Sequence, residues 1–448
     1  MEQLFNFLSQ NPQIHHVIPS SPDFNNLRSG YVIDSIVPAI IVRPRSADDV
    51  AGLVTVLKKN SLAFSVRVGG SDMFNRFHVK DTVTIDLREI AHINVDQESQ
   101  TARLGGGVII SDLLRVLDEH GMVAPHPIIS SVGYVGWATH GGYGLLSSEY
   151  GMGAEQILQA KIVDADGAVR DADEDMLTVI RGGGGALGVI VELTIRVYSL
   201  TQLLAGFIVY DSQDLPMTIR RYNDAYRQQK EAGIPKELNL FQSVTHGPTG
   251  KAMGVIFVWA SSDFDAGQKW LSKVSSWSPV AMSTVAPTTM SVFNESTKTI
   301  APQSAYGKSL TLSLRELTPE VVEVICKHAS LQPNSPATIF GMHELRGCAP
   351  QPPLNTLIAH RHPHFVMELL PTVRDADLLD AAVAWAHEFY EDLMKTDPAN
   401  IMASTYLPLT EPGKVNMKGI FGDKYEFLKV MKHRHDPENV FEHALVRL

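Results

Sequence analysis

The chain has 448 residues, of which 44% are hydrophobic, a formal net charge of -11 at pH 7 and two cysteines. This length exceeds what one hydrophobic core usually supports, so we expect at least two domains. The acidic balance disfavours non-specific nucleic-acid binding, and two cysteines exclude a disulfide scaffold or a cysteine-rich metal site. No apolar run approaches the roughly 18 residues that span a bilayer, and the first ten residues lack a secretory signal pattern. We therefore expect a cytoplasmic protein that binds a small molecule, and neither nucleic acid nor a membrane.

The first recognisable unit is a strand, a helix and a second strand. The strands are predicted at residues 39–42 and 63–68, and the helix between them begins after Ser46 and carries apolar residues at i, i+3, i+4 and i+7 from Val50. Such a unit joins parallel strands by a right-handed crossover. The second strand runs into a turn that contains Gly69, Gly70, Ser71 and Asp72. An ordinary tight turn would explain these glycines, but they also let backbone N–H groups approach an anion at the carboxyl end of a strand.

Two more glycine-rich segments follow, at residues 130–144 and 181–188. The first of them offers little that could form a packed amphipathic element, so we expect a closely approaching ligand there, with a solvent loop as the alternative. The second contains the spacing G-x-G-x-x-G, but that fingerprint must open a helix, and residues 189–197 alternate like a strand. We therefore predict three glycine clusters at strand ends that bind a phosphate-bearing cofactor through loops.

The second half of the chain changes pattern, because helices alternate with strands between residues 203 and 408. The predicted helices are 215–230, 319–331 and 375–395, and the predicted strands are 238–244, 254–260, 338–344 and 356–370. Helices on one face of an antiparallel sheet are the expected arrangement.

Several short motifs occur in a fixed order along the chain. They cover residues 67–70, 132–144, 150–152, 163–167, 181–189 and 432–441. Together they resemble the FAD-binding domain of the vanillyl-alcohol oxidase and p-cresol methylhydroxylase (PCMH) superfamily, most closely its berberine bridge enzyme-like branch. The resemblance implies an α+β fold with a PCMH-type FAD-binding domain of two α/β subdomains and a substrate domain of antiparallel sheet covered by helices. We accordingly expect an FAD-binding domain at 1–202, a substrate domain at 203–408 and a return to the FAD-binding domain at 409–448.

The resemblance implies FAD as the cofactor and assigns its contacts to the glycine segments and the C-terminal motif. The implied contact residues are Arg67, Val68, Gly69, Gly70, Ser71, Asp72, Ser131, Val132, Gly133, Gly136, Thr139, His140, Gly141, Gly142, Tyr143, Gly188, Val189 and Asn439. In this branch a histidine and a cysteine usually bond covalently to the flavin, and their positions are Ser71 and Ile129 here. Neither side chain can form such a bond, so we predict non-covalent FAD. The small Val132, which the resemblance places beside the flavin, favours access of O₂.

The candidates for acid–base chemistry are Tyr406, Glu344, Arg361 and His360. Tyr406 resembles a tyrosine that family members place over the flavin, where it could act as an acid or base if its pKa were lowered; a core tyrosine with a satisfied hydroxyl is the alternative. The other three lie on predicted strands that the resemblance places toward the active site. The histidines of this region show no metal-ligand spacing, so we expect no metal.

These features predict an FAD-dependent oxidase that takes a hydride from a small organic, secondary-metabolite substrate at flavin N5. The missing covalent bonds leave open a redox-neutral cyclase or pericyclase of the Diels-Alderase type, in which the pocket supplies proximity and orientation. A flavin-binding protein without catalysis is a third possibility.

Overall fold

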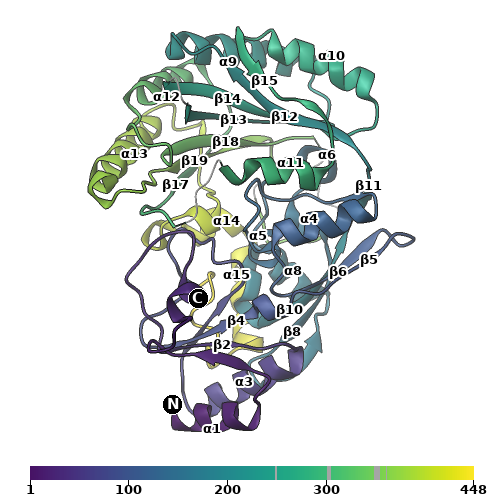
Figure 1. Ribbon diagram of the computed structural model, residues 1–448, viewed down its shortest axis with the longest axis vertical. Helices are drawn as coiled ribbons and strands as arrows, with labels where there is room; N and C mark the ends of the chain where they lie inside the picture. The colour runs from purple at the N-terminus through teal and green to yellow at the C-terminus, as the bar shows by residue number, and fades with distance from the viewer. Residues whose placement is uncertain (248–249, 300–303, 348–353, 360) are drawn as a thin grey trace.

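The structure is a computed structural model that describes residues 1–247, 250–299, 304–347, 354–359 and 361–448. Within these ranges the strands form a four-stranded, a five-stranded, a two-stranded and a nine-stranded sheet. Figure 1 shows the nine-stranded sheet with its helices in the upper half of the molecule and the smaller sheets in the lower half. The α+β class predicted from the sequence is confirmed.

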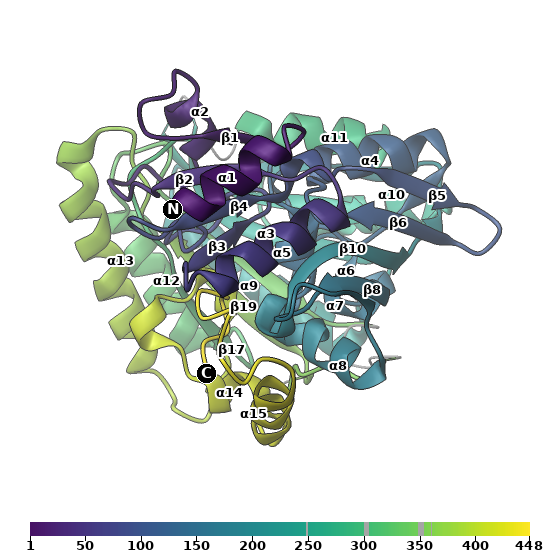
Figure 2. The ribbon, with the colours of Figure 1, turned by 90° about the horizontal axis from the view of Figure 1, so that it is seen from below.

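The four-stranded sheet contains the strand–helix–strand unit predicted from the sequence. Its bounds are His15–Val17 for β1, Ile40–Arg43 for β2, Phe64–Arg67 for β3 and Val83–Asp86 for β4. Helix α3 (Ala47–Lys59) connects β2 to β3, and the Ser46 hydroxyl caps it by accepting a hydrogen bond from the Asp49 amide at 3.1 Å. Strands β2 and β3 both run parallel to β4, which lies between them. Helix α1 (Glu2–Gln10) packs beside α3 (Figure 2).

The five-stranded antiparallel sheet packs against α3 and has the order β5, β6, β10, β8, β9. Its bounds are Ile93–Asp96 for β5, Thr101–Gly105 for β6, Ile157–Val163 for β8, Val169–Asp171 for β9 and Val189–Arg196 for β10. The other short elements before β12 are α2 (Phe24–Arg28), which contacts β2, α4 (Ile110–Glu119), β7 (Met122–Val123), α6 (Ser147–Tyr150), which contacts β13 and β18, α7 (Gly153–Gln156) and β11 (Tyr198–Ser199). The strand predicted at 189–197 is confirmed.

The prediction that all three glycine clusters lie at strand ends holds for the first and for the third, which leads directly into β10, and is wrong for the second. The first cluster follows β3. The second contains a buried helix, α5 (Tyr134–Ala138), where no packed element was expected, and the third follows helix α8 (Glu174–Gly183). Helix α8 loses helical geometry at Arg181 and Gly182 (φ 142° at Gly182), and Gly184 (φ 60°) turns the chain toward β10. Glycine adopts these positive φ angles without strain, which is why the helix can end so abruptly.

The nine-stranded sheet is antiparallel, with the order β15, β12, β14, β13, β18, β19, β17, β20 and with β16 beside β12. Its bounds are Leu203–Tyr210 for β12, Leu238–Gly247 for β13, Gly250–Trp259 for β14, Val280–Ser283 for β15, Ala286–Thr288 for β16, Leu310–Leu314 for β17, Ile339–Leu345 for β18, His364–Leu370 for β19 and Ile401–Met402 for β20. Its helices are α9 (Leu215–Ala232), α10 (Phe264–Ser275), α11 (Met290–Ser296), α12 (Pro319–Leu331) and α13 (Leu379–Met394). Helices α9, α10, α12 and α13 cover its outer face (Figure 1).

Successive side chains of this sheet point to opposite faces, as the pleat requires. On β12, Ile208 and Tyr210 belong to the core beneath the helices, whereas Phe207 and Val209 face the smaller sheets. The same alternation holds on the neighbouring strands, so one face is covered and the other borders the lower half of the molecule.

The strand predicted at 356–370 begins only at His364. Before it, the Leu357 amide donates to the Arg181 carbonyl at 2.9 Å and the Ala359 amide donates to the Ile420 carbonyl at 3.3 Å. These backbone groups bond to α8 and to α14 (Met417–Phe421) rather than to a neighbouring strand, which is why no strand forms.

The chain ends beside the smaller sheets, where α15 (Lys424–His435) packs against α8. The buried Lys432 ammonium fixes it by donating to Asp436 Oδ2 at 2.6 Å and to the Ala186 carbonyl at 3.1 Å. In the part of the chain that the structure describes, no helix combines the length and the apolar character needed to cross a bilayer.

Candidate active site

A cavity of about 570 Å³ lies between the glycine segments and the uncovered face of the nine-stranded sheet. One wall comes from the loops after β3 and around α5, and the other comes from β12, β13, β14, β18 and β19. The volume falls in the range of cofactor and ligand sites, roughly 300–1,000 Å³.

Most of the residues predicted to contact the cofactor line this cavity. They are Val68, Gly69, Gly70, Ser71, Asp72, Val132, Gly133, Gly136, Thr139, His140, Tyr143, Gly188 and Val189. The remaining predicted residues, Arg67, Ser131, Gly141, Gly142 and Asn439, are not part of its lining. The three glycine segments therefore all contribute to the cavity, although not every residue named within them does.

Arg67 supports the first loop from behind. Its guanidinium donates to the carbonyls of Leu27 and Ser29, and burial lowers its pKa to about 10. A Cβ on Gly70 (φ 80°) would meet the Arg67 side chain, so Gly70 is required both by its backbone conformation and by this guanidinium.

The first two glycine segments touch each other through their backbones. A Cβ on Gly69 would collide with the Gly133 amide nitrogen, and a Cβ on Gly133 would collide with the Val68 side chain. By contrast, a Cβ on Gly136 or on Gly185 would meet no atom within 4 Å, although both glycines line the cavity. The backbone is thus exposed to open space at these two positions, as expected of a cradle for a closely approaching ligand.

Asp72 connects the first glycine loop to the segment that carries Tyr406. Its carboxylate accepts three bonds from Arg76, from Nε at 2.7 Å, Nη2 at 2.8 Å and the backbone amide at 3.0 Å. Arg76 Nη2 also donates to the Pro408 carbonyl at 2.7 Å. The turn after β3 and the turn after Tyr406 are therefore fixed to each other across the cavity rim.

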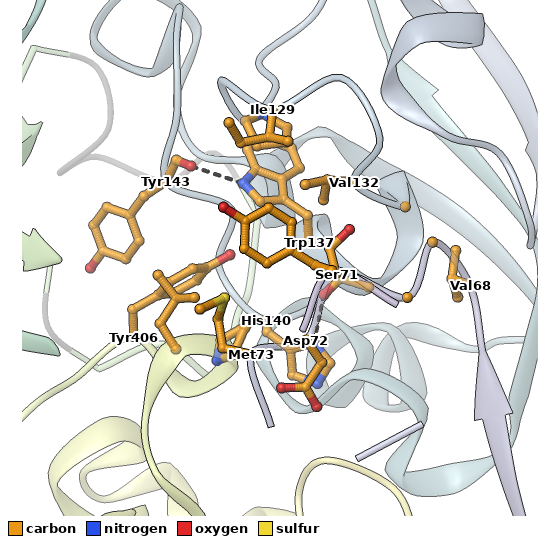
Figure 3. A pocket seen from close by; sticks show the side chains of 18 of the residues that line it. Val68, Ser71, Asp72, Met73, Ile129, Val132, Trp137, His140, Tyr143 and Tyr406 are labelled. Carbon is orange, nitrogen blue, oxygen red and sulfur yellow. Dashed lines mark hydrogen bonds between the residues drawn. The ribbon is translucent and has the colours of Figure 1, made fainter. Parts of the chain in front are cut away.

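Tyr143 and Tyr406 lie side by side, on the side of the cavity opposite Val68 (Figure 3). Their ring centroids are 5.3 Å apart at an interplanar angle of 81°. The Tyr143 hydroxyl donates to His364 Nε2 at 2.9 Å, because His364 Nδ1 donates to the His362 carbonyl at 2.7 Å.

Tyr406 does not have the lowered pKa that an acid–base role would need. Burial and the nearby Glu368 carboxylate raise the pKa of Tyr406 well above its ordinary value. Its phenol therefore stays protonated and can donate a hydrogen bond but cannot serve as a base. His140, which also lines the cavity, is neutral, because burial lowers its pKa to about 4.

Glu368 and His343 form a polar pair on the sheet wall that the sequence did not reveal. His343 Nε2 lies 3.1 Å from Glu368 Oε1, and both side chains line the cavity. Glu344, the predicted candidate, is one residue further along β18 and faces the helices. Its carboxylate accepts hydrogen bonds from the Tyr226 hydroxyl and, at 3.0 Å, from Arg346 Nε. The period-two alternation of the strand was the signal that could have separated His343 from Glu344.

Arg361, another predicted catalytic residue, is not among the residues that line this cavity. Arg361 forms an interior ion pair with Glu155, and burial lowers its pKa to about 10. His360 lies outside the described residues. Of the four candidates, the structure places Tyr406 at the cavity.

Comparison with known proteins agrees with this architecture. A family model described as an FAD binding domain matches residues 38–173. FAD-linked oxidoreductase aurO of Gibberella zeae is 30% identical over 438 residues, which cover 96% of this chain and 85% of that protein. Berberine bridge enzyme-like 24 of Arabidopsis thaliana is 31% identical over 213 residues, or 45% of this chain and 39% of that one.

Among solved structures, 6-hydroxy-D-nicotine oxidase from Arthrobacter nicotinovorans superimposes with a TM-score of 0.85 at 20% identity and covers 97% of both chains. This likeness defines the fold as that of PCMH-type flavoproteins. The chain belongs to the berberine bridge enzyme-like family of FAD-linked oxidoreductases.

The residues at the cavity fit FAD. The open backbone at Gly136 and Gly185 leaves room for a ligand, and the loop of Gly69 and Gly70 presents main-chain groups to the same space. FAD would be held by the loops around Val132 and α5 and by the loop of Gly69 and Gly70.

The substitution Gly136→Val tests this cradle. Because its Cβ meets no protein atom, the free energy of unfolding should change by less than about 1 kcal/mol, since valine is no worse than glycine in a helix. The added methyl groups would nevertheless occupy ligand space, so the visible flavin absorbance relative to protein absorbance should fall at least about tenfold.

Gly413→Val is the matched control, because Gly413 also faces open space but does not line the cavity. It should purify with unchanged flavin. Full flavin content in Gly136→Val, with circular dichroism like that of the unmodified protein, would contradict the assignment of the cradle.

Proposed function

We propose that this protein is an oxidase that removes a hydride equivalent and a proton from a small organic, secondary-metabolite molecule, with FAD held non-covalently. The observation that carries the proposal is Glu368, a carboxylate on the sheet wall of a cavity whose other wall is the glycine cradle. An oxidation of this kind needs an electron-pair acceptor and a proton acceptor on the same bound molecule.

FAD, when bound, supplies the acceptor of the hydride equivalent at flavin N5. Glu368 takes the substrate proton at a carboxylate oxygen, and His343 fixes that carboxylate through its 3.1 Å contact. Tyr406 remains protonated and donates a hydrogen bond to the substrate. The apolar strands around Glu368 exclude water from the bound molecule.

Two side chains that line the cavity support the proposal that FAD has no covalent link to the protein. Ser71 Oγ donates to the Ser131 carbonyl at 3.4 Å, and Ile129 offers only carbon atoms. Neither provides the imidazole or thiol that attaches flavin in the related branch. The loops alone therefore retain the cofactor.

Acid precipitation should release all of the FAD. Because only hydrogen bonds and packing would hold it, unfolding the chain removes every interaction with the cofactor. The yellow colour should appear in the supernatant, and its chromatographic retention should equal that of free FAD. Colour that stays with the washed pellet would show a covalent bond.

Glu368→Gln should abolish the proton acceptor without changing the shape of the cavity. Under anaerobic mixing with aromatic secondary alcohols and cyclic amines, at least one compound should bleach the flavin of the unmodified protein. Glu368→Gln should slow that bleaching at least about 100-fold, the usual scale of general base catalysis.

Glu344→Gln is the contrasting variant, since Glu344 lies on the same sheet but faces the helices. It should leave the bleaching rate unchanged in protein that remains folded. A loss of rate in Glu344→Gln with normal bleaching in Glu368→Gln would reverse the assignment. Absence of bleaching by every compound, with product still formed from one of them, would favour the redox-neutral cyclase.

A further inference from the structure

The sheet wall of the cavity is largely apolar, with Ser243 and Thr245 of β13 and the pair of His343 and Glu368 as its polar side chains. Alternation on five adjacent strands turns large hydrophobic side chains to this face and their neighbours to the helices. The side chains that form this surface are Phe207, Val209, Phe241, Ile256, Ile339 and Leu370. A molecule that covers it must present a broad apolar area.

Phe241 gives this wall a flat aromatic centre. Its ring lies over Gly341 of the neighbouring strand, where a Cβ would collide with it. The same ring packs against His343, with centroids 4.6 Å apart. The polar pair of His343 and Glu368 therefore borders an aromatic surface directly, so a bound ring would place a substituent next to the carboxylate.

Tyr31 adds a further polar group, and it comes from a distant part of the chain. Its amide donates to the Gly70 carbonyl at 2.9 Å, and its carbonyl accepts from the Ala305 amide at 3.1 Å. The next residue, Tyr306, exchanges two backbone bonds of 2.8 Å with Val373, just beyond the end of β19. The N-terminal segment thus bridges the glycine loop and the strand that carries Glu368.

The phenol of Tyr31 lines the cavity, and burial together with the charge of Glu368 raises its pKa to about 12. It is therefore a hydrogen-bond donor next to an acceptor. Glu368 Oε1 is engaged by His343, which leaves Oε2 to accept from a ligand.

The charges of the sheet wall disfavour an anionic group on the substrate. Among the described residues that form this wall there is neither lysine nor arginine, and Arg76, on the loop after β3, is held by both oxygens of Asp72 and by the Pro408 carbonyl. A carboxylate or phosphate on the ligand would meet Glu368 without an uncommitted cation to offset it. Two like charges a few ångströms apart repel strongly in a site with little water.

We propose that the substrate is a flat, ring-bearing apolar molecule that presents a hydroxyl or a cationic N–H group, and no anionic group, to Glu368, with Tyr31 as a specificity-determining contact. This inference rests on the proposed function only in taking the same cavity as the substrate site. It names the class of molecule, which the family assignment does not.

Three probes that share a naphthalene ring and differ in their polar group test the proposed substrate class: 2-naphthol, 2-naphthamidine and 2-naphthoate. None has a carbon that can give up a hydride, so their binding to the oxidised holoprotein is measured without turnover, from the perturbation of the flavin spectrum and by calorimetry. The hydroxyl and the amidinium probes should bind, and the carboxylate should bind at least about tenfold more weakly.

Two variants test which residues cause the differences in affinity between the probes. Glu368→Gln should lower the affinity for 2-naphthamidine at least about tenfold, and should reduce the difference between the affinities for 2-naphthamidine and 2-naphthoate. Tyr31→Phe should weaken 2-naphthol several-fold, by the loss of one hydrogen bond. Tyr306→Phe is the matched control, because Tyr306 belongs to the same backbone bridge but does not line the cavity, and its affinities should be unchanged.

Equal affinity for the three probes, tighter binding of the carboxylate, or binding of none of them would overturn the inference. An order of affinities that is unchanged in Glu368→Gln would also overturn it. These outcomes are independent of the proposed oxidation, because a protein that bleaches its flavin with a carboxylated substrate would refute the substrate class and leave the oxidase intact.

Discussion

The contact between two glycine backbones, at Gly69 and Gly133, is the constraint on which the rest of the site depends. With no Cβ on either residue, the loop after β3 and the loop before α5 can touch, and the space beyond them stays open at Gly136 and Gly185. A side chain at either contact would push the loops apart. The cofactor cradle therefore depends on the absence of Cβ atoms at Gly69 and Gly133. The polar groups that the cradle offers are main-chain groups, which do not change with the sequence.

The second constraint on the site is the alternation of side chains between the two faces of the nine-stranded sheet. A difference of one residue decides whether a side chain on β18 meets α9, as Glu344 does, or the cavity, as His343 does. The register of β18 and β19 then brings His343 within 3.1 Å of Glu368. The proposed acid–base pair thus depends on strand pairing, whereas the cofactor cradle depends on loops.

Strong local signals in the sequence, such as helix caps and glycine clusters, predicted the corresponding parts of the structure well. The helix predicted at 319–331 has those bounds, because Pro319 at its start and the capping hydroxyl of Thr318 fix where it begins. The glycine loops could be located because glycine at high density is costly without a ligand. Tyr31 and Glu368 could not be found in this way, because backbone bonds to Gly70 and Ala305 place Tyr31 and the pairing of β19 with β17 and β18 places Glu368, and these contacts join residues that are not neighbours in the sequence. The strand predicted before His364 was wrong for the same reason, because its backbone bonds to α8 and α14.

The most direct measurement is turnover with 5-deaza-FAD in place of FAD, since the central claim is that electrons pass from the substrate to the cofactor. The analogue accepts a hydride, but its reduced form reacts poorly with O₂. With the molecule that the protein converts, we expect one product per bound analogue and then a halt. Continued formation of the same product over many turnovers would contradict the oxidation and establish a reaction in which the cofactor only shapes the pocket.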